Sequence, residues 1–457
     1  MRKRARAFIG LIAAAAMAIA PFAAYAEGGT QDAAAREVAP IQASTSAELA
    51  ANLGVLKGDG GGVTDAYLDK RATRLQSAIL YLRLLGKEAE ALGESGTDSF
   101  ADASAVGVSG KPILAYLKAH PELGWQGTTG GRFDPNAPIT AQQLYKVMLE
   151  ALGYASASDF AYADTLAFAS GQGLRRIAGV GELTNRDLGV ALVEALQAKP
   201  KGGEDTLARK LEKAGALAPD RTAGLTASRI DASRAADGTT FLTDGEGRAL
   251  YLFTKDTVSL EACLDGCLAN WPVFSADKLI VADGLAAKDF GVHVRADGTK
   301  QVTYRGWPLY YFVKDKPGDT FGEGVGGVWY LIKKPFYTTS IGTDAKLGNY
   351  LTDTQGRTLY YFDKDPSGSS VCSGACLANW PAFHADAATV PSGLKPSDFG
   401  EIVREDGAKQ STFKGYPLYY FAKDAERGDT YGQGIGGVWF VIDPAKFDGT
   451  TAGRASS

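Results

Sequence analysis

Four cysteines offer the sharpest candidate chemistry in this sequence. They form two Cys-x-x-x-Cys pairs, Cys263 with Cys267 and Cys372 with Cys376. Paired thiols can close a disulfide, exchange disulfides with another protein or bind a soft metal such as copper. The N-terminus described below indicates export, and exported cysteines meet an oxidising environment. We therefore predict one local disulfide within each pair.

A metal or redox site at these cysteines is the alternative. A soft metal would usually recruit histidine or methionine as well. Beyond residue 26 the sequence offers three histidines and one methionine: His120, His293, His384 and Met148. No histidine recurs at the matching position of the other cysteine segment, and covalent haem would need a two-residue spacing followed by histidine. We predict no cofactor, with copper handling or redox exchange as the competing hypothesis.

Hydrolytic chemistry finds less support. Neither a Gly-x-Ser-x-Gly elbow nor a His-Glu-x-x-His helix motif occurs. Four aspartates that end a recurring phrase could pair as acid and base: Asp256, Asp315, Asp365 and Asp424. Because each follows a predicted strand directly, we expect these side chains to stabilise turns instead. The sequence therefore favours a protein that is not an enzyme.

The cysteine segments belong to a tandem duplication. Cys263–Pro272 reappears as Cys372–Pro381, displaced by 109 residues, and Gly318–Trp329 reappears as Gly428–Trp439, displaced by 110. Trp307 of the first copy is replaced by Tyr416 in the second, which suggests a partly exposed position.

Within each copy the phrase Leu-Tyr-x-Phe-x-Lys-Asp occurs twice, at Leu250, Leu309, Leu359 and Leu418. On a strand, Tyr251 and Phe253 would point to one face, and Leu250 and Leu252 to the other. Turn signals before each phrase indicate β-hairpins. We predict two tandem antiparallel β domains of sandwich or barrel type, at 229–335 and 336–447, and then a flexible tail at 448–457.

This half resembles a secreted repeat family marked by a Tyr-x-aromatic-x-x-Asp motif, whose biochemical role is unassigned. Twelve residues carry the resemblance: Tyr251, Phe253, Asp256, Tyr310, Phe312, Asp315, Tyr360, Phe362, Asp365, Tyr419, Phe421 and Asp424. Members often carry a lipid-attachment cysteine, and this chain has none near its N-terminus.

The first half is rich in alanine and leucine and poor in aromatic residues, which favours helices. Apolar residues recur at helical spacing over 73–85, 140–153 and 184–196. Thr73, Thr140 and Thr184 stand where N-caps belong. Three helices with matching starts indicate an internal repeat over 45–220.

The segment Gly131–Thr140 resembles the end of an S-layer homology repeat, in degenerate form. That family folds as a helical trefoil and holds exported proteins to anionic cell-wall polysaccharide. The resemblance implies glycan binding by Arg74, which follows Thr73 as the family arginine does, and by Trp125 as the aromatic residue between repeats. A guanidinium suits an anionic glycan because its planar fork matches a carboxylate or phosphate.

The N-terminus reads as a signal peptide. Arg2, Lys3, Arg4 and Arg6 precede an apolar run, and Ala24-Tyr25-Ala26 offers a cleavage site, so we predict removal of residues 1–26. No second long apolar run follows, which predicts no membrane span in the mature chain. Removing those four basic residues leaves 44 Lys and Arg against 52 Asp and Glu, a net charge of −8 that argues against a nucleic-acid partner.

These observations predict a multidomain α + β protein, secreted to the wall or surface of a Gram-positive bacterium. It would bind wall polysaccharide through its helical half and display two β repeats of unassigned role, as a binding or scaffold protein. The sequence does not determine its oligomeric state.

Overall fold

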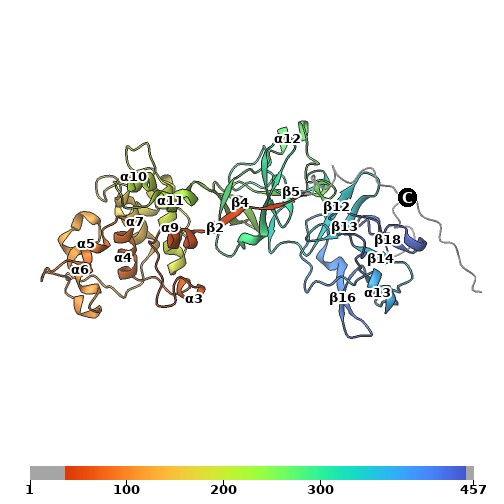
Figure 1. Ribbon diagram of the computed structural model, residues 1–457, viewed down its shortest axis with the longest axis horizontal. Helices are drawn as coiled ribbons and strands as arrows, with labels where there is room; N and C mark the ends of the chain where they lie inside the picture. The colour runs from red at the N-terminus through yellow and green to blue at the C-terminus, as the bar shows by residue number, and fades with distance from the viewer. Residues whose placement is uncertain (1–36, 449–457) are drawn as a thin grey trace, which may run out of the picture.

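The computed structural model describes residues 37–448. The predicted signal peptide, residues 1–26, and the predicted tail beyond Asp448 lie outside this range. A helical unit and two β copies follow one another along the long axis of the molecule (Figure 1). No helix among residues 37–448 is long and apolar enough to cross a membrane.

The helical unit occupies residues 46–226, as predicted from its composition. Its α-helices are α2 (Ser46–Asn52), α3 (Asp65–Leu68), α4 (Arg74–Leu84), α5 (Glu88–Leu92), α6 (Gly110–Ala119), α7 (Ala141–Ala151), α8 (Thr165–Gly171), α9 (Asn185–Gln197), α10 (Leu207–Lys213) and α11 (Pro219–Thr222). Short 3₁₀ turns lie at Ala103–Ala105, Pro121–Leu123, Tyr162–Asp164 and Ala223–Thr226.

Threonine caps begin the three helices that the sequence predicted. Thr73 and Gln76 form a reciprocal capping box at the start of α4, and Thr140 and Gln143 form another at the start of α7. Thr184 precedes α9 and donates its backbone N–H to the following acidic side chain. Each box satisfies backbone donors that an uncapped helix would leave unpaired, and thereby fixes where the helix begins.

The segments that lead into these helices meet one another. The Ala72 N–H donates to the Leu183 carbonyl at 2.8 Å, and the Ile139 N–H donates to the Ala72 carbonyl at 3.2 Å. The starts of α4, α7 and α9 are therefore tied together, while their apolar faces share one core.

Copy 1 contains β3 (Ser228–Arg234), β4 (Thr240–Asp244), β5 (Tyr251–Phe253), α12 (Gly266–Asn270), β6 (Lys278–Val281), β7 (Phe290–Val294), β8 (Lys300–Tyr304), β9 (Trp307–Pro308), β10 (Trp329–Leu331) and β11 (Lys333–Lys334). Copy 2 contains β12 (Thr339–Asp344), β13 (Gly348–Asp353), β14 (Tyr360–Phe362), α13 (Ala375–Asn379), β15 (Phe399–Val403), β16 (Lys409–Phe413), β17 (Tyr416–Pro417) and β18 (Trp439–Val441). The strands form small sheets of two to five strands, and none of these sheets closes into a barrel within residues 37–448.

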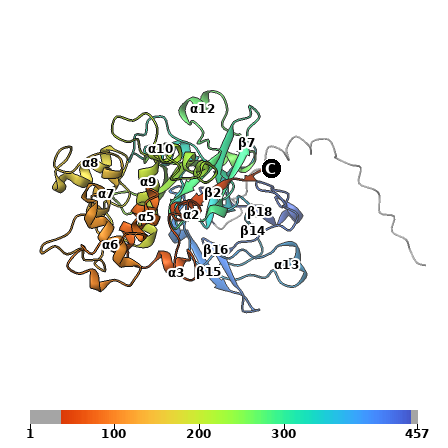
Figure 2. The ribbon, with the colours of Figure 1, turned by 60° about the vertical axis from the view of Figure 1, so that its left-hand side comes forward.

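Two strands ahead of the helices also belong to copy 1, which the sequence did not predict. β1 (Ala39–Pro40) pairs antiparallel with β7, and β2 (Gln42–Thr45) pairs parallel with β6. The sheet orders are β1-β7-β8-β9 and β11-β4-β3-β6-β2. Figures 1 and 2 both show β2, in red, reaching into the green strands of copy 1. The chain thus starts in copy 1, builds the helical unit and returns to copy 1.

Side chains on both sides of this junction are buried together. Ile280 of β6 packs into the helical core, whereas its neighbours Leu279 and Val281 face the core of the β half. Arg176 bridges the two units, because its Nη1 contacts Glu194 of α9 at 3.0 Å and its Nε contacts Asp231 of β3 at 3.0 Å.

The two β copies share one apolar cluster, so they are not independently packed. The cluster runs from Ile230 in copy 1 to Phe447 in copy 2. Trp307 is part of it and is fully buried, with its indole N–H donating to the Thr354 carbonyl of copy 2 at 2.9 Å. The expectation that Trp307 is partly exposed was therefore wrong, since this position lies at the interface between copies.

Candidate functional site

The four tyrosine motifs meet in pairs, two in each copy. In copy 1, Tyr251 and Tyr310 exchange backbone hydrogen bonds of 2.9 and 3.0 Å. In copy 2, Tyr360 and Tyr419 do the same at 2.8 and 2.9 Å. Each pair of motifs therefore runs antiparallel about a local twofold axis.

Tyrosine hydroxyls and motif aspartates are exchanged across this axis. The Tyr251 hydroxyl donates to Asp315 at 2.5 Å, and the Tyr310 hydroxyl donates to Asp256 at 2.8 Å. In copy 2 the corresponding bonds join Tyr360 to Asp424 at 2.6 Å and Tyr419 to Asp365 at 2.5 Å. Each tyrosine thus holds the aspartate of the other motif.

The same aspartates also order the loops that follow them. Asp256 accepts the backbone N–H of Ala262 at 3.0 Å, and Asp315 accepts that of Phe321 at 3.0 Å. Burial raises the pKa of Asp256 to about 8 and that of Asp424 to about 6, because a buried carboxylate loses its hydration. Sequence analysis expected turn residues here and did not foresee the partnership with tyrosine.

Next to these bonds lies a stack of four aromatic rings. In copy 1, Phe253 stacks on Trp329 at 4.1 Å, Trp329 on Trp271 at 3.8 Å, and Trp271 on Phe312 at 4.5 Å between ring centroids. In copy 2 the stack repeats in the same order with separations of 4.3, 3.8 and 4.4 Å: Phe362, Trp439, Trp380 and Phe421. Each motif phenylalanine therefore packs on the tryptophan that follows the other motif.

The cysteine pairs support this stack. Both pairs are at disulfide distance, Cys263 with Cys267 and Cys372 with Cys376, as predicted. Cys263 is buried against the aromatic cluster, and Trp271 directly follows the short helix that contains Cys267. The disulfide thereby fixes the helix that presents Trp271. Metal binding by either pair would first require its reduction.

Glycine lets the following loop cover the stack closely. A Cβ at Gly322 would lie 2.7 Å from the Tyr251 ring and 2.9 Å from the Trp271 ring, which no larger residue could tolerate. Gly432 stands in the same relation to Tyr360 and Trp380. Within residues 37–448, no group of three or more His, Cys, Asp or Glu side chains is placed to hold a metal ion.

The two residues that the sequence proposed for glycan binding lie together in a pocket of about 440 Å³ in the helical unit. Arg74 stands at the start of α4, and its Nε donates to the Phe133 carbonyl at 2.8 Å. Its guanidinium carbon lies 5.1 Å from the centre of the Phe133 ring. Only 8% of Arg74 is exposed, so this side chain also ties the loop before α7 to α4.

Unsatisfied polar atoms line the same pocket. Trp125 is 2% exposed, and its indole N–H has no hydrogen-bond partner among the described residues. One carboxylate oxygen of Glu150 is equally without a partner there, while the other contacts Lys146 at 2.8 Å. Burial raises the pKa of Glu150. A buried donor and acceptor without partners cost free energy, which a ligand bearing hydroxyl groups would recover.

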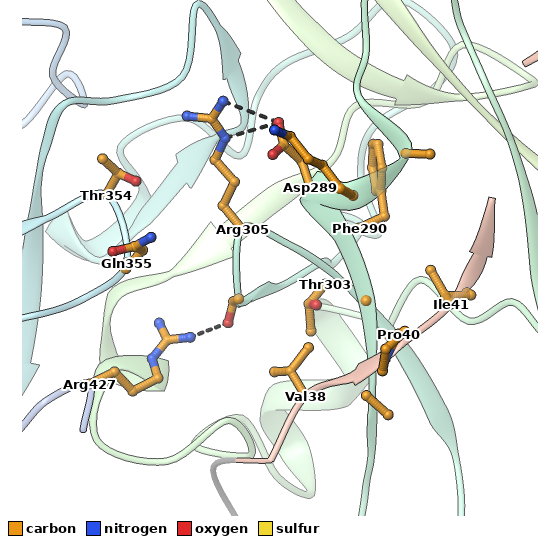
Figure 3. Close-up of a pocket in the computed structure, with 15 residues that line it drawn as sticks. Val38, Pro40, Ile41, Asp289, Phe290, Thr303, Arg305, Thr354, Gln355 and Arg427 are labelled. Carbon is orange, nitrogen blue, oxygen red and sulfur yellow. Dashed lines mark hydrogen bonds and ion pairs between the residues drawn. The ribbon is translucent and has the colours of Figure 1, made fainter. Parts of the chain in front are cut away.

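A second cleft, of about 810 Å³, lies where β1 crosses copy 1 near the start of copy 2 (Figure 3). Arg305 forms an ion pair with Asp289 at 3.1 Å on one side of the cleft. Arg427 of copy 2 donates to the Gly306 carbonyl and lies over the Trp307 ring at 4.5 Å. These contacts join the copies, and the charge of Arg305 is already satisfied within the wall of the cleft.

Comparison with known families identifies the β half. Four segments match the model of one family, described as a secreted repeat of unknown function: residues 232–275, 291–333, 343–384 and 400–443. The β half carries four secreted repeats. Each match contains one tyrosine motif, which confirms the predicted resemblance of this half. No match begins before residue 232, so the S-layer homology resemblance stays a prediction. The search of curated proteins found no match.

The repeats explain why the motif residues recur as they do. Each secreted repeat supplies one tyrosine, one phenylalanine, one aspartate and one later tryptophan to a cluster. Because tyrosine bonds the aspartate of the partner repeat and phenylalanine stacks on its tryptophan, one repeat alone cannot complete a cluster. Two repeats therefore make one structural copy.

Proposed function

We propose that this protein is a non-enzymatic surface protein of a Gram-positive bacterium. Its helical unit binds anionic cell-wall polysaccharide in the pocket of Arg74 and Trp125. Its four secreted repeats form a stiff body that the helical unit holds at the wall. The description of the matched family supports secretion, and the helical pocket supports the glycan.

The observation that carries the proposal is the chemistry of that pocket. It combines two cationic side chains, Arg74 and Lys146, with an indole N–H and a carboxylate oxygen that lack partners among the described residues. Cations suit the acidic groups of a wall polymer, and the unpartnered atoms suit the hydroxyl groups of a sugar. No group in the pocket is arranged as a nucleophile with a base, which favours binding over catalysis.

Co-sedimentation of the protein from residue 27 onward with wall fragments tests the proposal. Trp125→Phe keeps the ring and deletes the N–H, so we expect about tenfold weaker binding with the fold intact. Arg74→Ala should weaken binding further, but it also removes the bond to Phe133. Arg132→Ala, an exposed arginine outside the pocket, is the matched control and should bind as the wild type does.

Walls stripped of anionic polysaccharide should not retain the protein. Equal binding to stripped and intact walls would refute the proposal. So would wild-type binding by Trp125→Phe and Arg74→Ala, provided that circular dichroism shows both variants folded.

A further inference from the structure

The outer edge of β7 in copy 1 is covered by the chain's own N-terminal segment. Ala39 pairs with Val292 and Pro40 pairs with Gly291, and the Glu37 carbonyl lies 2.9 Å from Nδ1 of His293. Figure 3 shows Val38 and Pro40 lying along this edge beside Phe290 and Thr303. This segment completes the sheet β1-β7-β8-β9.

A glycine makes this approach possible. A Cβ at Gly291 would lie 2.5 Å from Cγ1 of Val38 and 2.9 Å from the Ala39 carbonyl oxygen, distances that real Cβ atoms do not show. Any larger residue at position 291 would therefore push β1 away. Glycine is unfavourable inside a strand, so its presence here reflects the close contact.

Copy 2 has the same edge without the cover. β15 corresponds to β7 with a displacement of 109 residues, and Gly400 stands in the place of Gly291. The sheet order is β15-β16-β17, and no strand among residues 37–448 pairs with the outer side of β15. A Cβ at Gly400 would meet only the Thr412 hydroxyl, at 3.1 Å. The gap that β1 requires is thus present but unused by the described chain.

The backbone of β15 is also oriented to receive a strand. Asp398 and Arg404, on either side of the strand, both bond toward β16. Because such bonds alternate along an antiparallel strand, the N–H and C=O of Glu401 point to the open side. Glu401 corresponds to Val292, which faces β1 in copy 1. Val403, at the end of this edge, is 69% exposed.

We infer that the outer edge of β15 accepts an extended peptide segment from another polypeptide, added antiparallel as a further strand. The segment that covers copy 1 gives the chemistry of the occupant: an apolar residue, a small residue opposite Glu401, and a residue opposite Gly400 that needs no N–H. Pro40 fills the last role in copy 1, since Gly291 directs its own backbone groups toward β8. Addition of a strand gains affinity from main-chain hydrogen bonds and selectivity from alternate side chains.

A labelled peptide of residues 37–45, Glu-Val-Ala-Pro-Ile-Gln-Ala-Ser-Thr, serves as the probe, with fluorescence anisotropy of the full-length mature protein as the measurement. We expect saturable binding, weakened at least about tenfold by Gly400→Val, which fills the gap, and by Glu401→Pro, which removes the outward N–H. Glu401→Gln keeps that N–H and should bind as the wild type does. A peptide N-methylated at Ala39 should bind weakly to every variant.

Absence of binding to the wild type would overturn the inference, and so would binding that Gly400→Val leaves unchanged, because the peptide would then have replaced β1 in copy 1. Self-association of the protein that Gly400→Val abolishes would make a second copy the occupant and would overturn the assignment to another polypeptide. The assay contains no wall polymer, so its result is independent of the function proposed for the helical unit.

Discussion

Copy 1 and copy 2 build the same aromatic cluster but place it in different surroundings. The two ring stacks agree within 0.2 Å in every centroid separation. Around them, copy 1 is enclosed by the helical unit, by β1 and by copy 2, whereas copy 2 ends the row (Figure 1). The cluster is thus fixed by the repeats themselves, and the differences reflect the neighbours of each copy.

Two positions show what the surroundings change. Trp307 is fully buried at the contact with copy 2, while its counterpart Tyr416 is half-buried and packs edge-on against Phe447 at 5.5 Å. Asp256 is fully buried beneath β12 of copy 2, whose Thr343 hydroxyl lies 2.7 Å from that of Thr254. Duplicated residues therefore acquire different energetic weight, which sequence identity between the copies does not reveal.

The largest expected difference concerns the contact between the copies. Trp307→Ala should lower the free energy of unfolding by about 3–5 kcal/mol, because it opens a cavity in the shared core and removes a bond to copy 2. Tyr416→Ala should cost about 2 kcal/mol, since that ring is only half-buried. Urea denaturation measures both. Trp307→Tyr, which reproduces copy 2, is the control with an intermediate loss, and equal losses for both alanine variants would show that the copies fold separately.

The disulfides should show no difference between the copies. Each closes a loop with a sequence separation of 4, so replacing either pair with serine should cost about 2 kcal/mol or less through the entropy of the unfolded chain. Urea denaturation of the two double variants, Cys263→Ser with Cys267→Ser and Cys372→Ser with Cys376→Ser, tests this equality. Peptide mapping without reduction should recover both local bonds.

A different outcome at the cysteines would revive the competing hypothesis. If the reduced protein binds copper or zinc in roughly stoichiometric amounts at each pair, and Cys372→Ser abolishes binding at its own pair, the pairs are metal sites.

The smallest expected difference is a pH dependence that separates the copies. The raised pKa values, about 8 for Asp256 and about 6 for Asp424, mean that the folded protein retains protons which the unfolded chain has lost above pH 4. Stability therefore falls as pH rises, through copy 2 only up to about pH 6 and through copy 1 up to about pH 8. Between pH 6 and 7, Asp256 alone should contribute a loss of about 1.4 kcal/mol.

Urea denaturation of Asp256→Asn at several pH values isolates this contribution. The variant should lack the loss between about pH 6 and 7, whereas Asp424→Asn should change the slope only below about pH 6. Identical slopes in the wild type and Asp256→Asn would mean that burial beneath β12 does not raise the pKa of this carboxyl.

Local patterns in the sequence predicted what depends on neighbouring residues. The threonine caps located α4, α7 and α9, and the alternation in the tyrosine phrase separated Tyr251 and Phe253 from Leu250 and Leu252, which belong to different clusters. The short spacing within each cysteine pair predicted the local disulfides. Each of these features is decided within a few residues of chain.

Features that join distant segments escaped prediction. The bond from Tyr251 to Asp315 spans 64 residues, and nothing in one motif indicates that its tyrosine serves the aspartate of another. β1 has two residues, one of them proline, so it carries no strand periodicity at all. The equal spacing from each motif phenylalanine to the next tryptophan was the one available signal for the ring stack.

The path of the chain through copy 1 has a mechanical consequence. β2 leaves copy 1 for the helical unit and β3 returns from it, and the two strands flank β6 on opposite sides. A single linker would let two bodies swivel, but two covalent crossings on either side of one strand resist torsion as well as extension. Thermal motion or shear acting on the far end of the protein is therefore passed to the helical unit as a turning force. A body joined in this way keeps a set angle to whatever surface the helices grip.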